Sequence, residues 1–365
     1  MKILFASPDL PSDRGNGSTV RSAQIWRALT TVGEVDVLQM VRGPETKLVS
    51  KPEESIGRIE FASPAMPWQT SVSKKVSALI DQATECKEYD VVVARYLRLG
   101  LFFGKKHSRV ILDGDDLRKH QSQFRTSFKN RLKATLEQRA RLVLTKMALP
   151  RFDHVWYVNA RDQATFRARA GSLLPNVITI PEVVPELRTS EPLTAVMVGN
   201  FAFEPNHMGA QFFIDQVLPR LLDSHPTFSL DLVGKVPDEV AKIWRQKPGL
   251  RLRGFVNELV DAYSDAQVVI APIFSGGGSQ IKVIEGLSYA RPVVASPFAV
   301  SGFAPHLLPE QHLLQADKPE EWAHQVVRLV ENPKAAEAIG LEGRKVVQSE
   351  FSYEKMRFIV SSTLS

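Results

Sequence analysis

Residues 271–296 read APIFSGGGSQIKVIEGLSYARPVVAS, and this stretch predicts the class of fold. The apolar run 268–273 predicts a short strand, and three consecutive glycines follow it. A helical pattern then continues to Arg291-Pro292, where the proline ends it, and 293–295 predict the next strand. The order strand, glycine loop, helix and strand is the βαβ unit of a doubly wound parallel sheet.

The glycine loop and the helix after it also predict a binding site. Glycines let backbone N–H groups approach an anion closely, and a helix N-terminus adds the positive end of its dipole. Lys282 and Glu285 are three residues apart and therefore share one face of this helix. We expect a cradle of this kind to hold a pyrophosphate and a ribose together.

Length and composition limit the class of protein. A chain of 365 residues with 44% hydrophobic and 24% charged residues predicts two globular α/β domains. The single cysteine, Cys86, excludes an internal disulfide and a cysteine metal cluster, which favours a reducing, cytosolic setting. The first residues predict no signal peptide, and no apolar run reaches the roughly 20 residues of a membrane span.

The N-terminus predicts a second βαβ unit with its own glycine loop. Gly15 and Gly17 precede a helix that we expect to begin at Val20, with Ser18 or Thr19 as its N-cap. Val20 stands where the GxGxxG fingerprint needs its third glycine, so a nicotinamide site is not supported. Two interpretations stay open: a flexible loop, or a loop that faces an anion or a substrate.

An acidic stretch follows the apolar strand predicted to begin at Val110. Its residues are Asp113, Gly114, Asp115 and Asp116. Carboxylates at the C-terminal end of a parallel strand point into the crevice where such sheets bind ligands. Asp113 and Asp115 could also ligate a divalent metal, and Asp116 could equally cap a helix, so these alternatives stay open.

The segment 118–151 carries ten basic residues and one acidic residue. Its apolar residues fall mostly on one helical stripe: Phe128, Leu132, Leu136, Val143 and Met147. A basic amphipathic helix is typical of binding to anionic lipid, whereas a solvated helix would pack this stripe on the sheet. We favour packing for the stripe and leave the basic face open. Nucleic acid is not expected, because no aromatic residues alternate with the charges.

A proline-rich stretch, 181–192, predicts a linker to a second array of strands and helices. In this second half, the segments GFVNEL (254–259), AYSDAQVVIAPI (262–273) and 276–296 resemble the retaining glycosyltransferases of family four. The segment 198–221 resembles a subgroup of them. The resemblance implies a GT-B fold, with two facing Rossmann-like domains and an interdomain cleft.

In that fold the last helix returns to the first domain. The resemblance therefore implies an acceptor-side domain over 1–182, a nucleotide-sugar domain over 193–348 and a returning helix over 349–365.

The resemblance also implies roles for individual residues. Glu285 should bind the ribose hydroxyls, and Phe255 and Val256 should line the base pocket. The implied donor site contains Gly15, Gly17, Arg21, Gly199, Asn206, Phe255, Val256, Gly277, Gly278, Ser279, Gln280, Lys282 and Glu285. Asp115, Lys282 and Glu285 are the implied catalytic residues, and Asn16, Asp113 and Asp116 lie on the acceptor side.

The sequence departs from the family pattern at four positions. The first glutamate of the family's pair falls at Gly277, which has no side chain. The arginine and lysine that usually hold the pyrophosphate fall at Asn200 and Pro205. Asp115 replaces a frequent histidine.

These departures leave the leaving group without its usual cations. We infer that Lys282 takes over part of the charge neutralisation, with Arg21 or Arg14, because a dianionic pyrophosphate would otherwise be poorly stabilised.

The predicted function is sugar transfer with retention of configuration, from a nucleoside diphosphate sugar to a saccharide or lipid-linked acceptor. No metal and no cofactor are expected. Cell-surface polysaccharide biosynthesis, in the cytoplasm or at the inner face of an anionic membrane, is the expected setting. Three alternatives remain: a degenerate nucleotide-sugar-binding partner protein, a nucleotide-sugar epimerase, and a metal-dependent transferase with an Asp-x-Asp motif.

Overall fold

The computed structural model describes residues 1–12, 17–43, 47–49, 55–62, 70–103, 109–115, 117, 139–140, 142–188, 192–276 and 279–365. These residues form two compact units. One contains the described residues up to Val177 together with Tyr353–Ser365, and the other contains Ile178–Ser352. Each unit has its own sheet and its own apolar core.

The N-terminal unit is built on an eight-stranded sheet in the order β3-β4-β2-β1-β5-β6-β7-β8. Its strands are β1 (Lys2–Ser7), β2 (Glu34–Gly43), β3 (Lys47–Val49), β4 (Gly57–Ala62), β5 (Val91–Arg95), β6 (Val110–Asp113), β7 (His154–Tyr157) and β8 (Gly171–Leu173). All neighbouring strands pair in parallel except β3 and β4.

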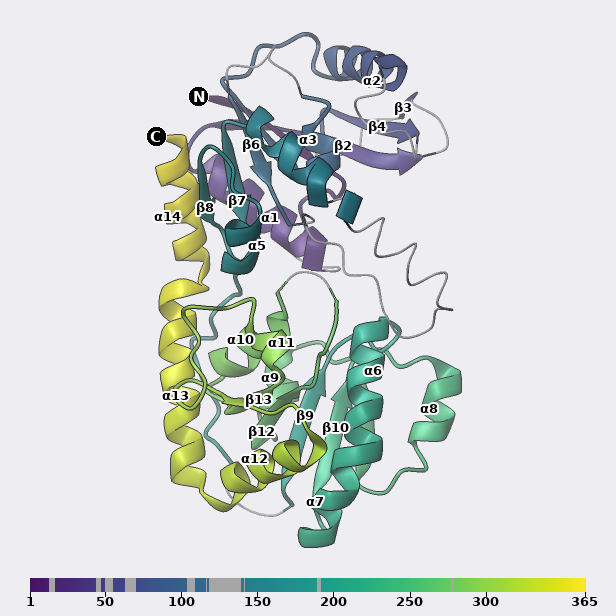
Figure 1. Ribbon diagram of the computed structural model, residues 1–365, viewed down its shortest axis with the longest axis vertical. Helices are drawn as coiled ribbons and strands as arrows, with labels where there is room; N and C mark the ends of the chain where they lie inside the picture. Colours follow the sequence, from purple (N-terminus) through teal and green to yellow (C-terminus); the bar gives the residue numbers. More distant parts are fainter. Residues whose placement is uncertain are drawn as a thin grey trace. The chain divides into compact units, whose positions relative to one another are not determined.

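Helices cover both faces of this sheet (Figure 1). They include α1 (Gly17–Thr30), α2 (Thr70–Ala83), α3 (Leu97–Gly100), α5 (Ala160–Thr165) and α14 (Tyr353–Leu364), with a 3-10 turn at Leu149–Arg151. Strand β1 shows why: Ile3 and Phe5 enter one core cluster, and Leu4 and Ala6 enter the other. A parallel strand that is apolar on both faces needs cover on both.

The last helix, α14, belongs to this first unit and packs on α1 (Figure 1). Met356 and Val360 are fully buried there, in one cluster with Ile25 of α1. The indole Nε1 of Trp156 in β7 donates a hydrogen bond of 3.1 Å to Oγ1 of Thr363. The return of the C-terminal helix to the first domain is therefore as the fold class predicted.

The C-terminal unit contains a six-stranded, all-parallel sheet in the order β11-β10-β9-β12-β13-β14. Its strands are β9 (Thr194–Val198), β10 (Ser229–Val233), β11 (Leu250–Gly254), β12 (Val268–Ala271), β13 (Val293–Ala295) and β14 (Leu314–Gln315). Its helices are α6 (Glu204–Phe212), α7 (Leu218–Ser224), α8 (Asp238–Trp244), α9 (Leu259–Tyr263), α10 (Ile281–Ser288), α11 (Pro297–Val300), α12 (Pro319–Glu331) and α13 (Pro333–Glu350), and a π-helical turn, Phe213–Val217, joins α6 to α7.

The βαβ unit predicted around the glycine loop is present as β12, α10 and β13. Strands β12 and β13 pair in parallel, with Val269 opposite Val293. Hydrogen bonds hold the linker after the N-terminal unit ends. Arg291 donates to the carbonyls of Pro185 and Glu186, and Arg344 donates to that of Pro181. This part of the linker is therefore fastened to the C-terminal unit.

One interpretation of the basic segment is wrong for the part that the structure describes. Val143 and Met147, in the helical residues 142–148, expose 57% and 70% of their surface and do not pack on the sheet. Ala148 and Leu149 take the buried positions instead. Phe128, Leu132 and Leu136 lie outside the described residues.

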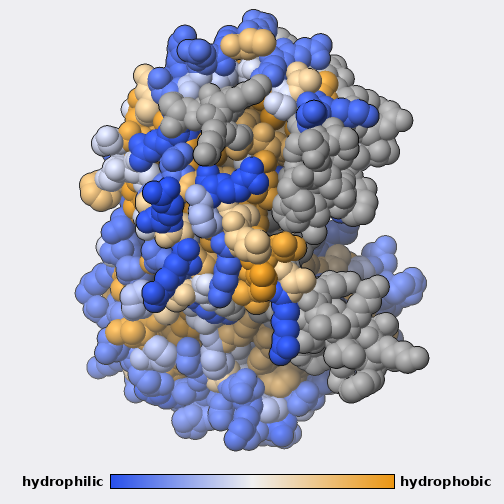
Figure 2. Space-filling view, turned by 45° about the horizontal axis from the view of Figure 1, so that its top comes forward, coloured by the Kyte–Doolittle hydropathy of each residue, from blue (hydrophilic) through white to orange (hydrophobic). Residues whose placement is uncertain are grey.

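The surface is otherwise mixed in character. In the coloured part of the face shown in Figure 2, hydrophilic side chains (blue) alternate with groups of apolar side chains (orange). Among the residues that the structure describes, no helix combines the length and the apolar character needed to cross a membrane.

Candidate active site

The predicted donor residues of the C-terminal unit follow the carboxyl ends of its parallel strands. Gly199 comes directly after β9, Phe255 after β11, and the glycine loop after β12. Because parallel strands end at one edge of the sheet, these segments share the edge where such sheets bind ligands. Gly277 and Gly278 lie outside the described residues, so their predicted role is not addressed.

The structure brings Lys282 and Asn206 together. The ammonium of Lys282, in the first turn of α10, donates a hydrogen bond of 2.7 Å to Oδ1 of Asn206 in α6. Nδ2 of Asn206 donates in turn to the carbonyl of Asn200, at 2.9 Å. Burial lowers the pKa of Lys282 to about 8, although the charge of Glu285 opposes this shift. Among the described residues, Lys282 has few hydrogen-bond partners, and burial disfavours its charged form. A bound anion would stabilise that form.

Three glycines allow α6 to come this close to the glycine loop. A Cβ atom at Gly209 would lie 2.0 Å from the carbonyl oxygen of Pro272, just before the loop. A Cβ atom at Gly199 would lie 3.0 Å from Nδ2 of Asn206. Gly276 has a φ of +124°, which L side chains rarely adopt. Side chains at these positions would displace Asn206 from Lys282.

Glu285 lies one turn after Lys282 and is half-buried. Burial raises its pKa, while the charge of Lys282 and the hydroxyl of Tyr263 oppose the rise. Tyr263 is fully buried, stacks on Tyr289 with ring centroids 5.0 Å apart, and its hydroxyl has no hydrogen bond of regular geometry among the described residues. Sequence reasoning missed Tyr263, because nothing in AYSDAQ indicates that its hydroxyl faces α10.

The start of α10 retains free capacity for an anion. Ser279 has a buried Oγ with no hydrogen-bond partner among the described residues. Gln280 is buried and precedes the helix, but its side chain makes no capping hydrogen bond. The first N–H groups of α10 therefore lack a cap from Gln280, which is the arrangement that favours a bound phosphate.

The two residues predicted for the base pocket differ in burial. Phe255 exposes 82% of its surface directly after Gly254, whose φ is +71°. Val256 is partly buried and packs against the core of the C-terminal unit. An exposed aromatic ring at the end of a strand is available for stacking, so the predicted contact with a base stays a prediction.

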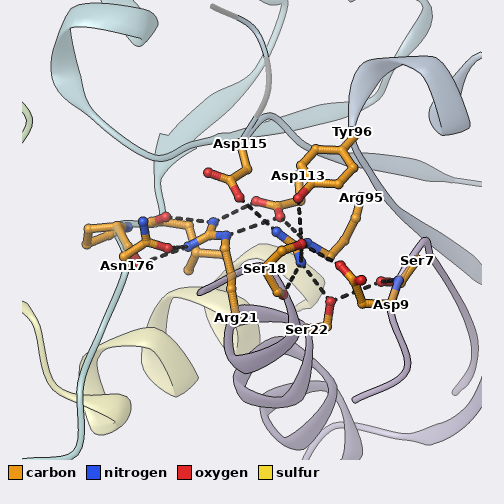
Figure 3. A network of polar contacts seen from close by, with 12 residues as sticks. Ser7, Asp9, Ser18, Arg21, Ser22, Arg95, Tyr96, Asp113, Asp115 and Asn176 are labelled. Carbon is orange, nitrogen blue, oxygen red and sulfur yellow. Dashed lines mark hydrogen bonds and ion pairs between the residues drawn. The ribbon is translucent and has the colours of Figure 1, made fainter. Parts of the chain in front are cut away.

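In the N-terminal unit, Arg21 is engaged in a buried ion pair. Its Nη2 lies 2.6 Å from Oδ1 of Asp113, and both side chains are at most 1% exposed (Figure 3). The same guanidinium donates to the carbonyls of Leu174 and Pro175 and to Oδ1 of Asn176. These contacts join α1 to β6 and to residues 174–176, and they occupy the guanidinium for which a phosphate contact was predicted.

Asp113 also binds Arg95, which sequence reasoning did not single out. Nε of Arg95 donates to Oδ2 of Asp113 at 2.9 Å, and its Nη2 donates to Oδ2 of Asp115 at 2.8 Å (Figure 3). Burial by itself would raise the pKa of Asp113, but the charges and hydrogen bonds of Arg21 and Arg95 hold it below its usual value. Asp113 and Asp115 thus both accept hydrogen bonds from guanidinium groups. The described residues contain no group of three or more His, Cys, Asp or Glu placed to hold a metal ion.

Asp115 differs from Asp113 in exposure. Its side chain is 16% exposed, against 0% for Asp113. Burial is the largest cause that raises the pKa of Asp115. The guanidinium groups of Arg21 and Arg95 oppose the rise, whereas the carboxylates of Asp113 and Asp162 add to it. Asp115 is therefore the more accessible of these two carboxylates.

Ser18 links α1 to the same network. Its hydroxyl donates to Asp9 and shares a hydrogen bond of 2.6 Å with the hydroxyl of Tyr96. Ser18 is therefore not the predicted N-cap: α1 begins at Gly17, three residues before the predicted start. Gly15, Asn16 and Asp116 lie outside the described residues.

Two parallel-sheet units of the Rossmann type, with the last helix packed on the first unit, define the GT-B fold. Residues 192–332 match the family model described as "Glycosyl transferases group 1". The match lies within the C-terminal unit, so this part of the sequence is similar to group 1 glycosyltransferases. No curated protein matches the chain.

Solved structures support the same fold over the whole chain. Sucrose-phosphate synthase from Thermosynechococcus elongatus has a TM-score of 0.68 at 17% identity, covering 100% of this chain and 98% of that one. HepE from Anabaena, in complex with UDP and glucose, has a TM-score of 0.67 at 15% identity, with 100% and 99% covered. The lipopolysaccharide outer core galactosyltransferase WaaB has a TM-score of 0.67 at 14% identity, with 100% of both chains covered.

Proposed function

We propose that this protein is a retaining glycosyltransferase that moves a sugar from a nucleoside diphosphate sugar to a saccharide or lipid-linked acceptor. The observation that carries the proposal is the cluster of Lys282, Asn206 and Glu285 beside the start of α10, where the N-cap residue Gln280 makes no side-chain capping hydrogen bond. Structures of HepE with UDP and with UDP-glucose support a donor of this class, since that protein shares the fold.

The donor's charged part is assigned to the start of α10. The pyrophosphate accepts hydrogen bonds from the first N–H groups of the helix and from the ammonium of Lys282. Glu285, one turn further on, accepts hydrogen bonds from the ribose hydroxyls. Stabilising negative charge on the departing diphosphate with fixed donors is the main catalytic contribution of such a site. Chemistry without a metal fits this arrangement, because the ammonium and the helix supply the neutralising charge.

The acceptor is assigned to the N-terminal unit, at the partly exposed carboxylate of Asp115. A membrane-associated acceptor agrees with the surface around Val143 and Met147, because the exposed side chains of Arg139, Lys146 and Arg151 lie on the same segment. Apolar side chains that can enter the headgroup region, flanked by cations, are what an anionic lipid surface attracts. Polysaccharide or glycoconjugate biosynthesis at the membrane is the setting that this surface favours.

A thermal-shift screen tests the donor site directly. We expect one nucleoside diphosphate and its sugar to stabilise the full chain, by about 2.7 kcal/mol at about 100 times its Kd. Lys282→Ala and Glu285→Ala should each remove most of this shift. Lys345→Ala and Glu342→Ala are matched controls, since that exposed pair is also three residues apart on one helix.

Product analysis then separates the remaining interpretations. Transfer that needs an acceptor, with an unchanged anomeric configuration in the product by NMR, supports the proposal. Sugar conversion without an acceptor would indicate an epimerase. Binding of the donor with no consumption in the presence of many acceptors would indicate a degenerate binding protein. Loss of activity in a chelator would contradict metal independence.

A further inference from the structure

Arg95 joins three segments of the N-terminal unit through one buried guanidinium. It is the last residue of β5 and is 0% exposed. Its Nη1 donates to the carbonyl of Ser18 at 2.6 Å and to Oγ of Ser22 at 2.7 Å, both in α1. Its Nε and Nη2 bind Asp113 and Asp115 at the end of β6 (Figure 3).

Arg21 provides the comparison that separates packing from positioning. It is buried as deeply and shares Asp113, but its other hydrogen bonds go to backbone and side-chain oxygens of residues 174–176. Arg95, by contrast, donates to Asp115, the carboxylate that is partly exposed. Both arginines thus neutralise Asp113, and among the described residues the hydrogen bond from Nη2 of Arg95 orients Asp115.

We propose that Arg95 is a positioning residue for sugar transfer: it holds the carboxylate of Asp115 and the first turn of α1 in one fixed arrangement. This inference rests on the proposed function. The planar guanidinium can do this because it donates in three directions at once, whereas a lysine ammonium in the same place would keep the charge and lose the fork.

The charge of Arg95 has a second effect, on the protonation of Asp115. The groups that face Asp115 are Arg21 from α1, Arg95 from β5, Asp113 from β6, Asp162 from α5, and Tyr96. Removing the charge of Arg95 leaves the carboxylates of Asp113 and Asp162 opposed by the guanidinium of Arg21 alone among these groups. The ionised form of Asp115 is then less stable. As the pH falls, activity that needs this form is therefore lost at a higher pH than in the wild type.

Three variants of the full chain test the inference: Arg95→Lys, Arg21→Lys and Arg95→Gln. Arg95→Lys should lower kcat about 100-fold, the cost of a misplaced reacting group, with an unchanged KM for the donor. Arg21→Lys should lower the unfolding temperature about as much as Arg95→Lys does, but it should lower kcat far less. Arg95→Gln should in addition move the acidic limb of the pH profile of kcat/KM to higher pH.

The outcomes are distinguishable from failure of the proposed function. A wild-type protein that transfers no sugar to any acceptor overturns both. A wild type that is active, with equal losses of kcat in Arg95→Lys and Arg21→Lys, overturns the role of Arg95 alone. If Arg95→Lys does not fold, Ser22→Ala removes one of the hydrogen bonds of Arg95 and should still lower kcat severalfold without raising the KM for the donor; an unchanged kcat would overturn the role.

Discussion

The ammonium of Lys282 lies 2.7 Å from Oδ1 of Asn206, a residue 76 positions earlier in the chain. This hydrogen bond ties the first turn of α10 to α6 and uses one of the three N–H bonds of the ammonium. Asn206 is neutral, so it orients Lys282 without cancelling its charge. The positive charge remains available to an anionic ligand.

The first prediction concerns the pH dependence of donor binding. Because the pKa of Lys282 is lowered to about 8, raising the pH from 7 to 9 should deprotonate it and weaken nucleoside diphosphate binding by about tenfold. Isothermal titration calorimetry at both pH values measures this. Lys282→Met should bind weakly at both; an equally steep pH dependence in this variant would assign the titration to another group.

The same shift predicts the sign of a stability effect. The pKa of Lys282 is lower in the folded chain than its ordinary value of 10.5, so the unfolded chain binds this proton more readily between about pH 8 and 10.5. Over that window this residue makes the free energy of unfolding rise with pH. Urea titrations of the wild type and Lys282→Met, compared at pH 8 and pH 10, should show the difference.

Glu285 should discriminate between ribose and deoxyribose. If its carboxylate accepts hydrogen bonds from the ribose hydroxyls, Glu285→Gln should weaken the preferred nucleoside diphosphate by about 10- to 100-fold, the cost of a charged hydrogen bond. The deoxyribose analogue should bind the wild type and the variant with similar, weak affinity. If Glu285→Gln weakened the deoxyribose analogue as much as the ribonucleotide, the ribose would bind away from Glu285.

Gly209→Ala tests the packing that places Asn206. The new Cβ atom would lie 2.0 Å from the carbonyl of Pro272, so α6 has to move away from the end of β12. We expect a loss of about 1–3 kcal/mol in stability from this overpacking and weaker donor binding besides. Gly340→Ala on α13 is the matched control, because its added Cβ atom would lie 2.2 Å from the carbonyl oxygen of Ala290, an equally close approach away from α6. Equal donor affinity in both variants would separate α6 packing from the site.

The exposed apolar pair in the N-terminal unit predicts binding to lipid. Val143→Asp and Met147→Asp should each weaken cosedimentation with vesicles that contain phosphatidylglycerol, and pure phosphatidylcholine vesicles should bind the wild type poorly. Ile243→Asp removes an equally exposed apolar side chain from α8 and should have no effect. Wild-type binding that ignores both the lipid charge and these two substitutions would contradict a membrane role for this surface.

The parts of the fold that rest on local pattern could be predicted from the sequence. Strand β13 has the predicted bounds 293–295 and β6 begins at the predicted Val110, because apolar runs and a preceding proline mark these segments. The short helix α8, the two-residue strand β14 and the early start of α1 could not. Their stability comes from tertiary contacts, such as the hydrogen bonds of Ser18 to Asp9 and Tyr96, rather than from local propensity.

The candidate site divides in the same way. Lys282 and Glu285 could be singled out because they are neighbours on one helix face. Arg95 could not, because its partners are distant in the sequence. Its guanidinium binds Ser18 and Ser22, more than 70 residues earlier, and carboxylates at the end of the next strand. Asn206 became visible only through resemblance, and Tyr263 only through its burial beside Glu285.

The packing of α14 has a consequence for how the protein is made. The core cluster around β1 and α1 is completed by Met356, Val360 and Leu364 of α14. During translation the first strand is synthesised hundreds of residues before the helix that covers it. The N-terminal unit therefore cannot complete its core until α14 has been synthesised, and the whole C-terminal unit is translated in between.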